Sequence, residues 1–311
     1  MSEPVEYIDR ESGKLVREKI AGESSLRFCY ENWIGLKLLE LVIKRPWLSI
    51  LYGLYQDSGN SKKKIKQFVA DLAIDENEAE KPLSEYQSFN EFFARKLKAG
   101  ARPICTEHNR FIMPGDGRVT VIPKIENDRV FQVKGVNFLL SEFLDNASLA
   151  QNYEGGSMVI VRLCPADYHR FHFPFDGVPQ AIQKIRGHLY SVNPIALWQR
   201  PALFCENERV LVPFKLDTGQ ELLLIDVGAT MVGKIHQTYC PDQKFSKGDE
   251  RGYFTFGAST TVIVFPSNCI DLDADLTEAS ARGIETYCKM GSSLGLLSNH
   301  LLFEQSQSDK S

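Results

Sequence analysis

Apolar side chains recur at helical spacing in the first hundred residues. Trp47, Ile50, Leu51 and Leu54 occupy positions i, i+3, i+4 and i+7 behind Pro46, a residue that favours the first turn of a helix. A similar stripe lies just ahead of it, formed by Leu36, Leu39 and Ile43. A lysine run follows at Lys62, Lys63, Lys64 and Lys66. We therefore expect residues 1–105 to form a helical N-terminal region.

Two roles are open for these helices. They can pack on the rest of the protein with the lysines in solvent, or lie flat on an anionic lipid surface. The most apolar stretch, Trp33–Tyr55, is interrupted by charged residues and by Pro46. The uninterrupted pieces are about half of the roughly 20 residues that span a bilayer. The first residues also lack the basic and apolar segments of a secretion signal. We expect a protein that does not cross the membrane.

From about residue 106 the pattern changes to short apolar runs that alternate with turn signals. The runs are Ser157–Leu163, Arg209–Leu216, Glu221–Val227 and Thr260–Phe265. The turns are Pro114–Gly117, Asp176-Gly177, Asp217–Gly219 and Lys247–Asp249. Short strands bounded by such turns predict an antiparallel sandwich or small barrel over residues 106–311. A final helix is expected over Leu276–Met290, with a disordered tail at Glu304–Ser311. The predicted fold class is α+β, mainly β.

The composition narrows the functional classes. The 311 residues are 43% hydrophobic, which is enough for a substantial core, and the net charge of −4 gives no attraction to nucleic acid. Seven cysteines are scattered without a CxxC pair. This pattern indicates reduced thiols in an intracellular protein and argues against a structural zinc site.

Two histidines lie three residues apart in the segment Arg162–Pro174. On an extended segment His169 and His172 can reach one pocket, where one ring is oriented and the other exchanges protons. They can equally be structural histidines that donate to backbone carbonyls. As a metal site the segment is incomplete, because no third His or Cys lies at ligand spacing.

A serine follows small residues at the entrance to a buried strand. Ser259 comes after Gly257 and Ala258, which fits either an ordinary turn or a bent backbone. In a bend, the Ser259 hydroxyl can attack the Ala258 carbonyl, and strain in that peptide favours an ester. Asp116, in Pro114–Arg118, is either a turn residue or a carboxylate that orients an imidazole.

Together these segments resemble the phosphatidylserine decarboxylase family over most of the chain from about Phe89. The stretches that carry the resemblance are Phe92–Ile104, Pro114–Val119, Asp167–His172, Asn207–Val210, Gly228–Gly233 and Lys247–Thr260. Each is weak alone, and their order and number make the joint signal strong.

The resemblance implies that the chain cuts itself between Ala258 and Ser259. Ser259 then becomes a covalent pyruvoyl cofactor, and His172 with Asp116 completes the self-cleavage triad. The chain would separate into a large fragment (1–258) and a small one (259–311) that stay associated. One residue departs from the family pattern, because glycine is usual where this chain has Ala258.

The same resemblance implies decarboxylation of phosphatidylserine to phosphatidylethanolamine. The pyruvoyl ketone would form a Schiff base with the lipid amine and act as an electron sink, and His169 would protonate the carbanion. It also implies a catalytic domain of the barrel-sandwich type found in lipoyl carriers. No metal is implied.

We further expect a peripheral protein on the cytoplasmic face of a bacterial membrane, bound through the N-terminal amphipathic helices. A homodimer is left open. Two other functions remain: a non-cleaving lipid-binding relative, and a pyruvoyl decarboxylase of a soluble amino acid. A Ser–His–Asp hydrolase is disfavoured because no GxSxG motif is present.

Overall fold

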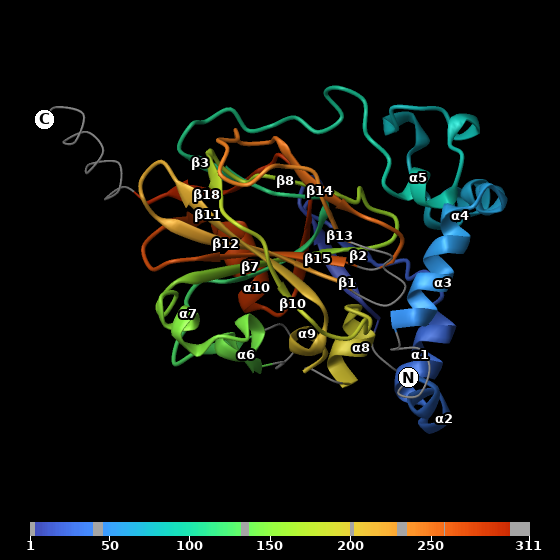
Figure 1. Ribbon diagram of the computed structural model, residues 1–311, viewed down its shortest axis with the longest axis horizontal. Helices are drawn as coiled ribbons and strands as arrows, with labels where there is room; N and C mark the ends of the chain where they lie inside the picture. The colour runs from blue at the N-terminus through green and yellow to red at the C-terminus, as the bar shows by residue number, and fades with distance from the viewer. Residues whose placement is uncertain are drawn as a thin grey trace, which may run out of the picture.

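The computed structural model describes residues 4–39, 46–131, 137–199, 202–228, 235–257 and 259–298. A ten-stranded sheet forms its centre (Figure 1). Along the sheet the strand order is β10 (Gln183–Ile185), β11 (Arg209–Leu216), β12 (Glu221–Val227), β15 (Ser259–Phe265), β7 (Ser157–Leu163), β4 (Gly117–Ile122), β17 (Glu285–Cys288), β1 (Glu6–Asp9) and β2 (Leu15–Arg17). The tenth strand, β9 (Gly177–Pro179), pairs with β11. All these pairings are antiparallel except that of β1 with β17.

Both faces of the central strands β4, β7, β12 and β15 are buried, which explains why these strands read as nearly continuous apolar runs. Along β7, Met158 and Ile160 pack into one core, whereas Val159 and Val161 pack into the other. Successive side chains of a strand point to opposite faces, so one apolar run supplies two cores.

Four short helices cover one face of the sheet, drawn below it in Figure 1. They are α6 (Leu140–Leu144), α7 (Ala147–Gln151), α8 (Pro194–Gln199) and α9 (Leu203–Glu206). The small ribbon of β5 (Arg129–Phe131) and β6 (Asn137–Leu139) leads into α6.

Two three-stranded sheets cover the opposite face and complete a sandwich. One consists of β13 (Ile235–Gln237), β14 (Glu250–Phe254) and β8 (Arg170–His172). The other consists of β16 (Ile270–Leu272), β18 (Ser293–Leu297) and β3 (Arg110–Ile112). The sandwich prediction is confirmed. Among the described residues the two edge strands of the large sheet, β10 and β2, do not pair with each other. The described strands therefore form an open sheet and not a closed barrel.

The N-terminal helices stand at one side of the sandwich, on the right in Figure 1. They are α1 (Glu23–Glu31), α2 (Trp33–Leu38), α3 (Pro46–Asp57), α4 (Ile65–Leu72) and α5 (Phe89–Phe93), with 3₁₀ turns at Gly59–Lys64, Glu76–Glu78 and Leu83–Glu85. A third core forms between α4, α5 and the loop that joins them, and its buried members are Ile65, Tyr86, Phe89, Phe92 and Phe93.

Two sequence expectations were wrong in their secondary structure. The region 1–105 was expected to be helical from its start, but Glu6–Asp9 and Leu15–Arg17 are strands at the edge of the large sheet. Leu276–Met290 was expected to be one helix, but α10 (Ala274–Ala281) is followed by β17. The strands β1 and β17 are short, and they pair with each other although they lie near opposite ends of the chain. This tertiary pairing outweighs the local structural preference of each segment. The predicted tail at 304–311 lies outside the described residues.

Candidate active site

Ser259 is the first residue of β15, where that strand pairs with Leu163 at the end of β7. Its side chain is fully buried, and its Oγ has no hydrogen-bond partner among the described residues. Leaving a buried hydroxyl unsatisfied costs about 1–3 kcal/mol. Such an atom in a native structure calls for an explanation, and a reactive role is one.

The backbone ahead of Ser259 adopts a conformation that favours glycine. Gly257 has φ 148°, in a region that residues with a Cβ essentially avoid. This agrees with the expectation that small residues serve a bend at this point. Ala258, the residue expected to carry the scissile carbonyl, lies outside the described residues.

Aromatic side chains from the N-terminal helices hold this segment in place. The ring of Phe256 packs edge-on against Phe89 of α5 at 5.0 Å and against Phe93 at 5.1 Å between centroids. The backbone N–H of Phe256 donates to Oδ1 of Asn90 at 3.0 Å. The helical region therefore fixes the chain three residues before Ser259.

His169 is buried against the same helix. Its ring lies 3.8 Å from the ring of Phe93, and its Nδ1–H donates to the Asp167 carbonyl oxygen at 2.9 Å. Its Nε2 has no partner among the residues described. Burial lowers the pKa of His169 to about 3, although the hydrogen bond to Asp167 raises it. The imidazole is thus neutral near pH 7 and presents a free lone pair on Nε2.

His169 also contacts the strand that leads to Ser259. Its carbonyl oxygen accepts the N–H of Phe254, the last residue of β14, at 2.9 Å. The Asp167 carboxylate shapes the preceding turn, because it accepts the N–H of Cys164 at 2.6 Å and pairs with Arg118 of β4.

His172 is held in a single tautomer. Its Nδ1–H donates to the Gly248 carbonyl oxygen at 2.8 Å, so Nε2 carries the lone pair and accepts the Tyr168 hydroxyl at 3.1 Å. Burial lowers the pKa of His172, although the bond to Gly248 raises it. Nε2 is therefore a proton acceptor near pH 7. The sequence analysis did not single out Tyr168, although it stands beside His169.

The turn that contains Asp116 lies beside the backbone of His172, but the Asp116 side chain does not bind the His172 ring. The N–H of His172 donates to the Pro114 carbonyl oxygen at 2.7 Å, next to the Asp116 turn. The Asp116 carboxylate accepts Nη2–H of Arg102 at 2.6 Å and the N–H of Met290 at 2.8 Å. The structure thus brings Asp116 and His172 into one neighbourhood, while the Gly248 carbonyl is the group that orients the imidazole.

Arg102 is a second residue that the sequence analysis left without a role. It bridges Asp116 and Glu78, donating to Glu78 at 2.9 Å. The paired guanidinium partly offsets the cost of burying the Asp116 carboxylate. Arg102 lies in the Phe92–Ile104 stretch that carries the family resemblance, and this was the only sign in the sequence that it has a role. Nothing in that stretch indicates that its partner is Asp116.

Comparisons with known proteins agree with this geometry. The family model for phosphatidylserine decarboxylase matches residues 89–296. A protein of Clostridium botulinum named phosphatidylserine decarboxylase proenzyme is 43% identical over 94% of this chain and 99% of its own length. Proteins with the same name from Clostridium beijerinckii and Fusobacterium nucleatum are each 44% identical over 94% of this chain and 98% of their own. This chain belongs to the phosphatidylserine decarboxylase family.

Proposed function

We propose that the chain decarboxylates phosphatidylserine to phosphatidylethanolamine, with a pyruvoyl group that it makes from Ser259 by cutting itself. The observation that carries the proposal is the buried Ser259 Oγ, which has no hydrogen-bond partner among the described residues and lies two residues after the strained φ of Gly257. The relatives' name, proenzyme, supports a processed chain.

In the self-cleavage, His172 Nε2 releases the Tyr168 hydroxyl and takes the proton of the Ser259 hydroxyl, and Oγ attacks the Ala258 carbonyl carbon. The peptide C–N bond breaks as the C–O ester bond forms, and the proton passes to the nitrogen of residue 259. Elimination then removes the Cα proton of residue 259 and breaks the ester Cβ–O bond, which leaves a carboxylate on Ala258 and a dehydroalanine at residue 259. A proton adds at Cβ as this enamine becomes an imine, and water then displaces ammonia to leave the ketone. Asp116 contributes negative charge beside His172 and thereby favours the protonated imidazole.

The two fragments are expected to stay together. β15, which begins at the new N-terminus, lies between β7 and β12 and pairs with both along most of its length. Its apolar side chains enter both cores of the sandwich.

The orphaned buried oxygen of Ser259 and the free Nε2 of His169 fit a carbonyl cofactor at position 259. Once formed, the pyruvoyl group supplies a carbonyl that draws electrons away from the bond to CO2. His169 is neutral and must gain a proton before it can donate one. We assign it the proton of the substrate ammonium, which it returns to the substrate carbon that has lost CO2. Phe93, whose ring lies tilted against the imidazole, excludes water from this transfer.

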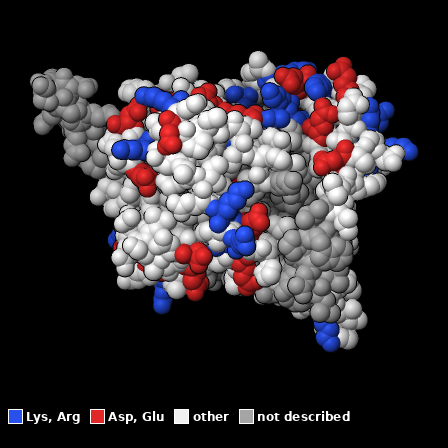
Figure 2. Space-filling view, in the orientation of Figure 1, with Lys and Arg blue, Asp and Glu red and all other residues white. Residues whose placement is uncertain are grey.

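Helices α1–α3 are proposed to rest on the membrane. Large apolar side chains on them are exposed, up to 66% for Trp33 and 62% for Leu54; the others are Phe28, Ile34, Leu38, Leu51 and Tyr55. Figure 2 shows charges of both signs gathered around α4 and α5. None of the described helices is long and apolar enough to span a bilayer. The seven cysteines are free, which fits the reducing cytoplasmic side.

The double variant Trp33→Glu, Leu54→Glu is expected to bind phosphatidylserine-containing vesicles at least about tenfold more weakly than wild type, because each change removes apolar area from the interface. Co-sedimentation with vesicles measures this. Leu15→Glu is the matched control, since Leu15 is 56% exposed but lies on β2. Equal weakening by the control would contradict the assignment of the surface to α1–α3.

The function itself is tested by incubating the purified protein with phosphatidylserine in mixed micelles. We expect phosphatidylethanolamine and CO2, detected by mass spectrometry, and loss of activity after treatment with hydroxylamine, which reacts with ketones. Equal turnover of free L-serine would favour a soluble amino-acid decarboxylase. A chain that stays whole and only binds lipid would favour the non-cleaving relative.

A further inference from the structure

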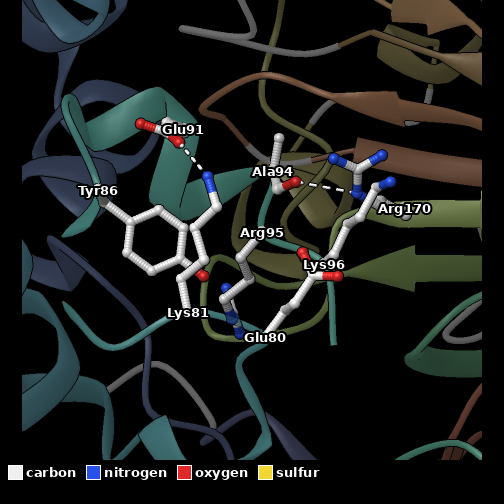
Figure 3. A pocket seen from close by; sticks show the side chains of 8 residues that line it. All are labelled: Glu80, Lys81, Tyr86, Glu91, Ala94, Arg95, Lys96 and Arg170. Carbon is white, nitrogen blue, oxygen red and sulfur yellow. Dashed lines mark hydrogen bonds and ion pairs between the residues drawn. The ribbon is translucent and has the colours of Figure 1, made fainter. Parts of the chain in front are cut away.

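A pocket of about 220 Å³ lies beside the C-terminal end of α5 (Figure 3). Four cationic side chains line it, together with two carboxylates: Lys81, Arg95, Lys96, Arg170, Glu80 and Glu91. Two of the cations are already compensated, because Lys81 pairs with Glu91 at 2.9 Å and Arg170 pairs with Glu250 at 2.8 Å. The described residues give neither Arg95 nor Lys96 an ion pair.

Arg95 is the unusual member of this set. Its side chain is only 5% exposed, Nη2–H donates only to the carbonyl oxygens of Ala166 (3.2 Å) and Asp167 (3.3 Å), and Nη1 has no partner among the described residues. A buried guanidinium without a counterion is costly, and an anion that enters the pocket offsets that cost. In Figure 3, Arg95 lies between Lys81 and Lys96.

The pocket adjoins the candidate active site. The Asp167 carbonyl oxygen accepts both Arg95 Nη2–H (3.3 Å) and His169 Nδ1–H (2.9 Å), so one atom separates the guanidinium from the imidazole. Arg95 is also two residues after Phe93, whose ring lies on His169. An anion held by Arg95 is therefore a neighbour of any group that His169 protonates.

We propose that Arg95 and Lys96 bind the phosphodiester of the serine headgroup of the lipid substrate, an inference that rests on the proposed function. In such a headgroup four covalent bonds separate the amine nitrogen from the phosphorus, roughly 5 Å when extended. Phe93 contacts both the His169 ring and Phe256, three residues before Ser259. We therefore place the phosphodiester of an amine that reacts at residue 259 on the side of His169 where Arg95 lies.

The phosphodiester fits these cations better than the headgroup carboxylate does. The carboxylate leaves as CO2, so a cation that bound it would stabilise the reactant and slow the reaction. The phosphodiester keeps its charge from start to finish. Arg95 and Lys96 consequently contribute equally to binding the reactant and the transition state, which affects KM and leaves kcat nearly unchanged.

The test is calorimetric binding of glycerophosphoethanolamine, the product headgroup without acyl chains, to the processed full-length protein. Lys96→Gln is expected to weaken binding about tenfold and Arg95→Gln by more, since Arg95 is desolvated. Lys98→Gln, an exposed lysine outside the pocket, is the matched control and should bind as wild type does. Ethanolamine, which lacks the phosphate, should bind the wild type and Lys96→Gln proteins alike.

Kinetics with glycerophosphoserine give the second measurement: Lys96→Gln should raise KM about tenfold and change kcat less than twofold. Inorganic phosphate should compete with glycerophosphoserine; phosphate that binds without competing would identify an anion site unrelated to the headgroup and overturn the inference. So would unchanged binding in Lys96→Gln, or a loss confined to kcat. Phosphate-dependent binding in a protein without decarboxylase activity would support this inference and contradict the proposed function instead.

Discussion

The Ser259→Ala protein is expected to remain one chain of about 35.2 kDa, while the wild type separates under denaturing conditions into residues 1–258 and 259–311. By share of length the wild-type fragments are roughly 29 and 6 kDa. The physical reason is that alanine lacks the Oγ nucleophile. Intact mass spectrometry measures the outcome, and a ketone reagent should label only the small wild-type fragment.

The substitution leaves the fold nearly undisturbed, because Ser259 Oγ makes no hydrogen bond to lose among the described residues. Thr260→Ala is the matched control. Its hydroxyl is also buried and without a partner in the part of the chain that the structure describes, but it points to the opposite face of the sheet. Thr260→Ala should therefore process normally. A Ser259→Ala protein that still divides at this bond would refute the assignment.

Intact mass spectrometry also distinguishes the role of the nucleophile, Ser259, from that of the general base, His172. His172→Asn keeps a donor for the Gly248 carbonyl and removes Nε2. The rate of self-cleavage should then fall about 10²–10⁴-fold, which is the usual contribution of a general base. Cleavage at the wild-type rate would exclude His172 as that base.

The His169→Asn protein is expected to cleave itself normally but to decarboxylate its substrate about 10²–10⁴-fold more slowly than the wild type. The Asn amide replaces Nδ1–H as the donor to the Asp167 carbonyl, while Nε2 disappears. The change therefore removes proton transfer with little effect on the local backbone. Rates of phosphatidylethanolamine formation, normalised to the amount of small fragment, measure it.

His108→Asn is the control for this prediction, because His108 is exposed and lies in the loop before β3. Its activity should equal that of the wild type. An unimpaired His169→Asn protein would show that another group, or water, supplies the proton. Failure to cleave would instead make His169 part of the processing step.

The sequence by itself determined the central strands and the position of Ser259. The runs Ser157–Leu163, Arg209–Leu216 and Glu221–Val227 are strands with those same bounds, and the run predicted from Thr260 begins one residue earlier, at Ser259. These strands are buried on both faces and therefore consist of consecutive apolar residues. Such a run can be recognised from the local sequence alone. The helical spacing around Leu51 and Leu54 likewise predicted α3. Both leucines are exposed, which the packing alternative for these helices does not predict and the lipid-surface alternative does.

Tertiary structure decided the contacts between segments distant in the sequence. Strand β1 forms a hairpin with β2, but it joins the large sheet by pairing with β17 near the other end of the chain, and no local pattern marks that partner. The same holds for the Asp116 carboxylate, which Arg102 and the Met290 backbone bind in place of His172. Arg95 is the clearest case: the fold buries it near His169, and none of the described residues forms an ion pair with it. Hydrophobic periodicity is a property of neighbouring residues, whereas burial and the pairing of charges depend on which distant segments the fold brings together.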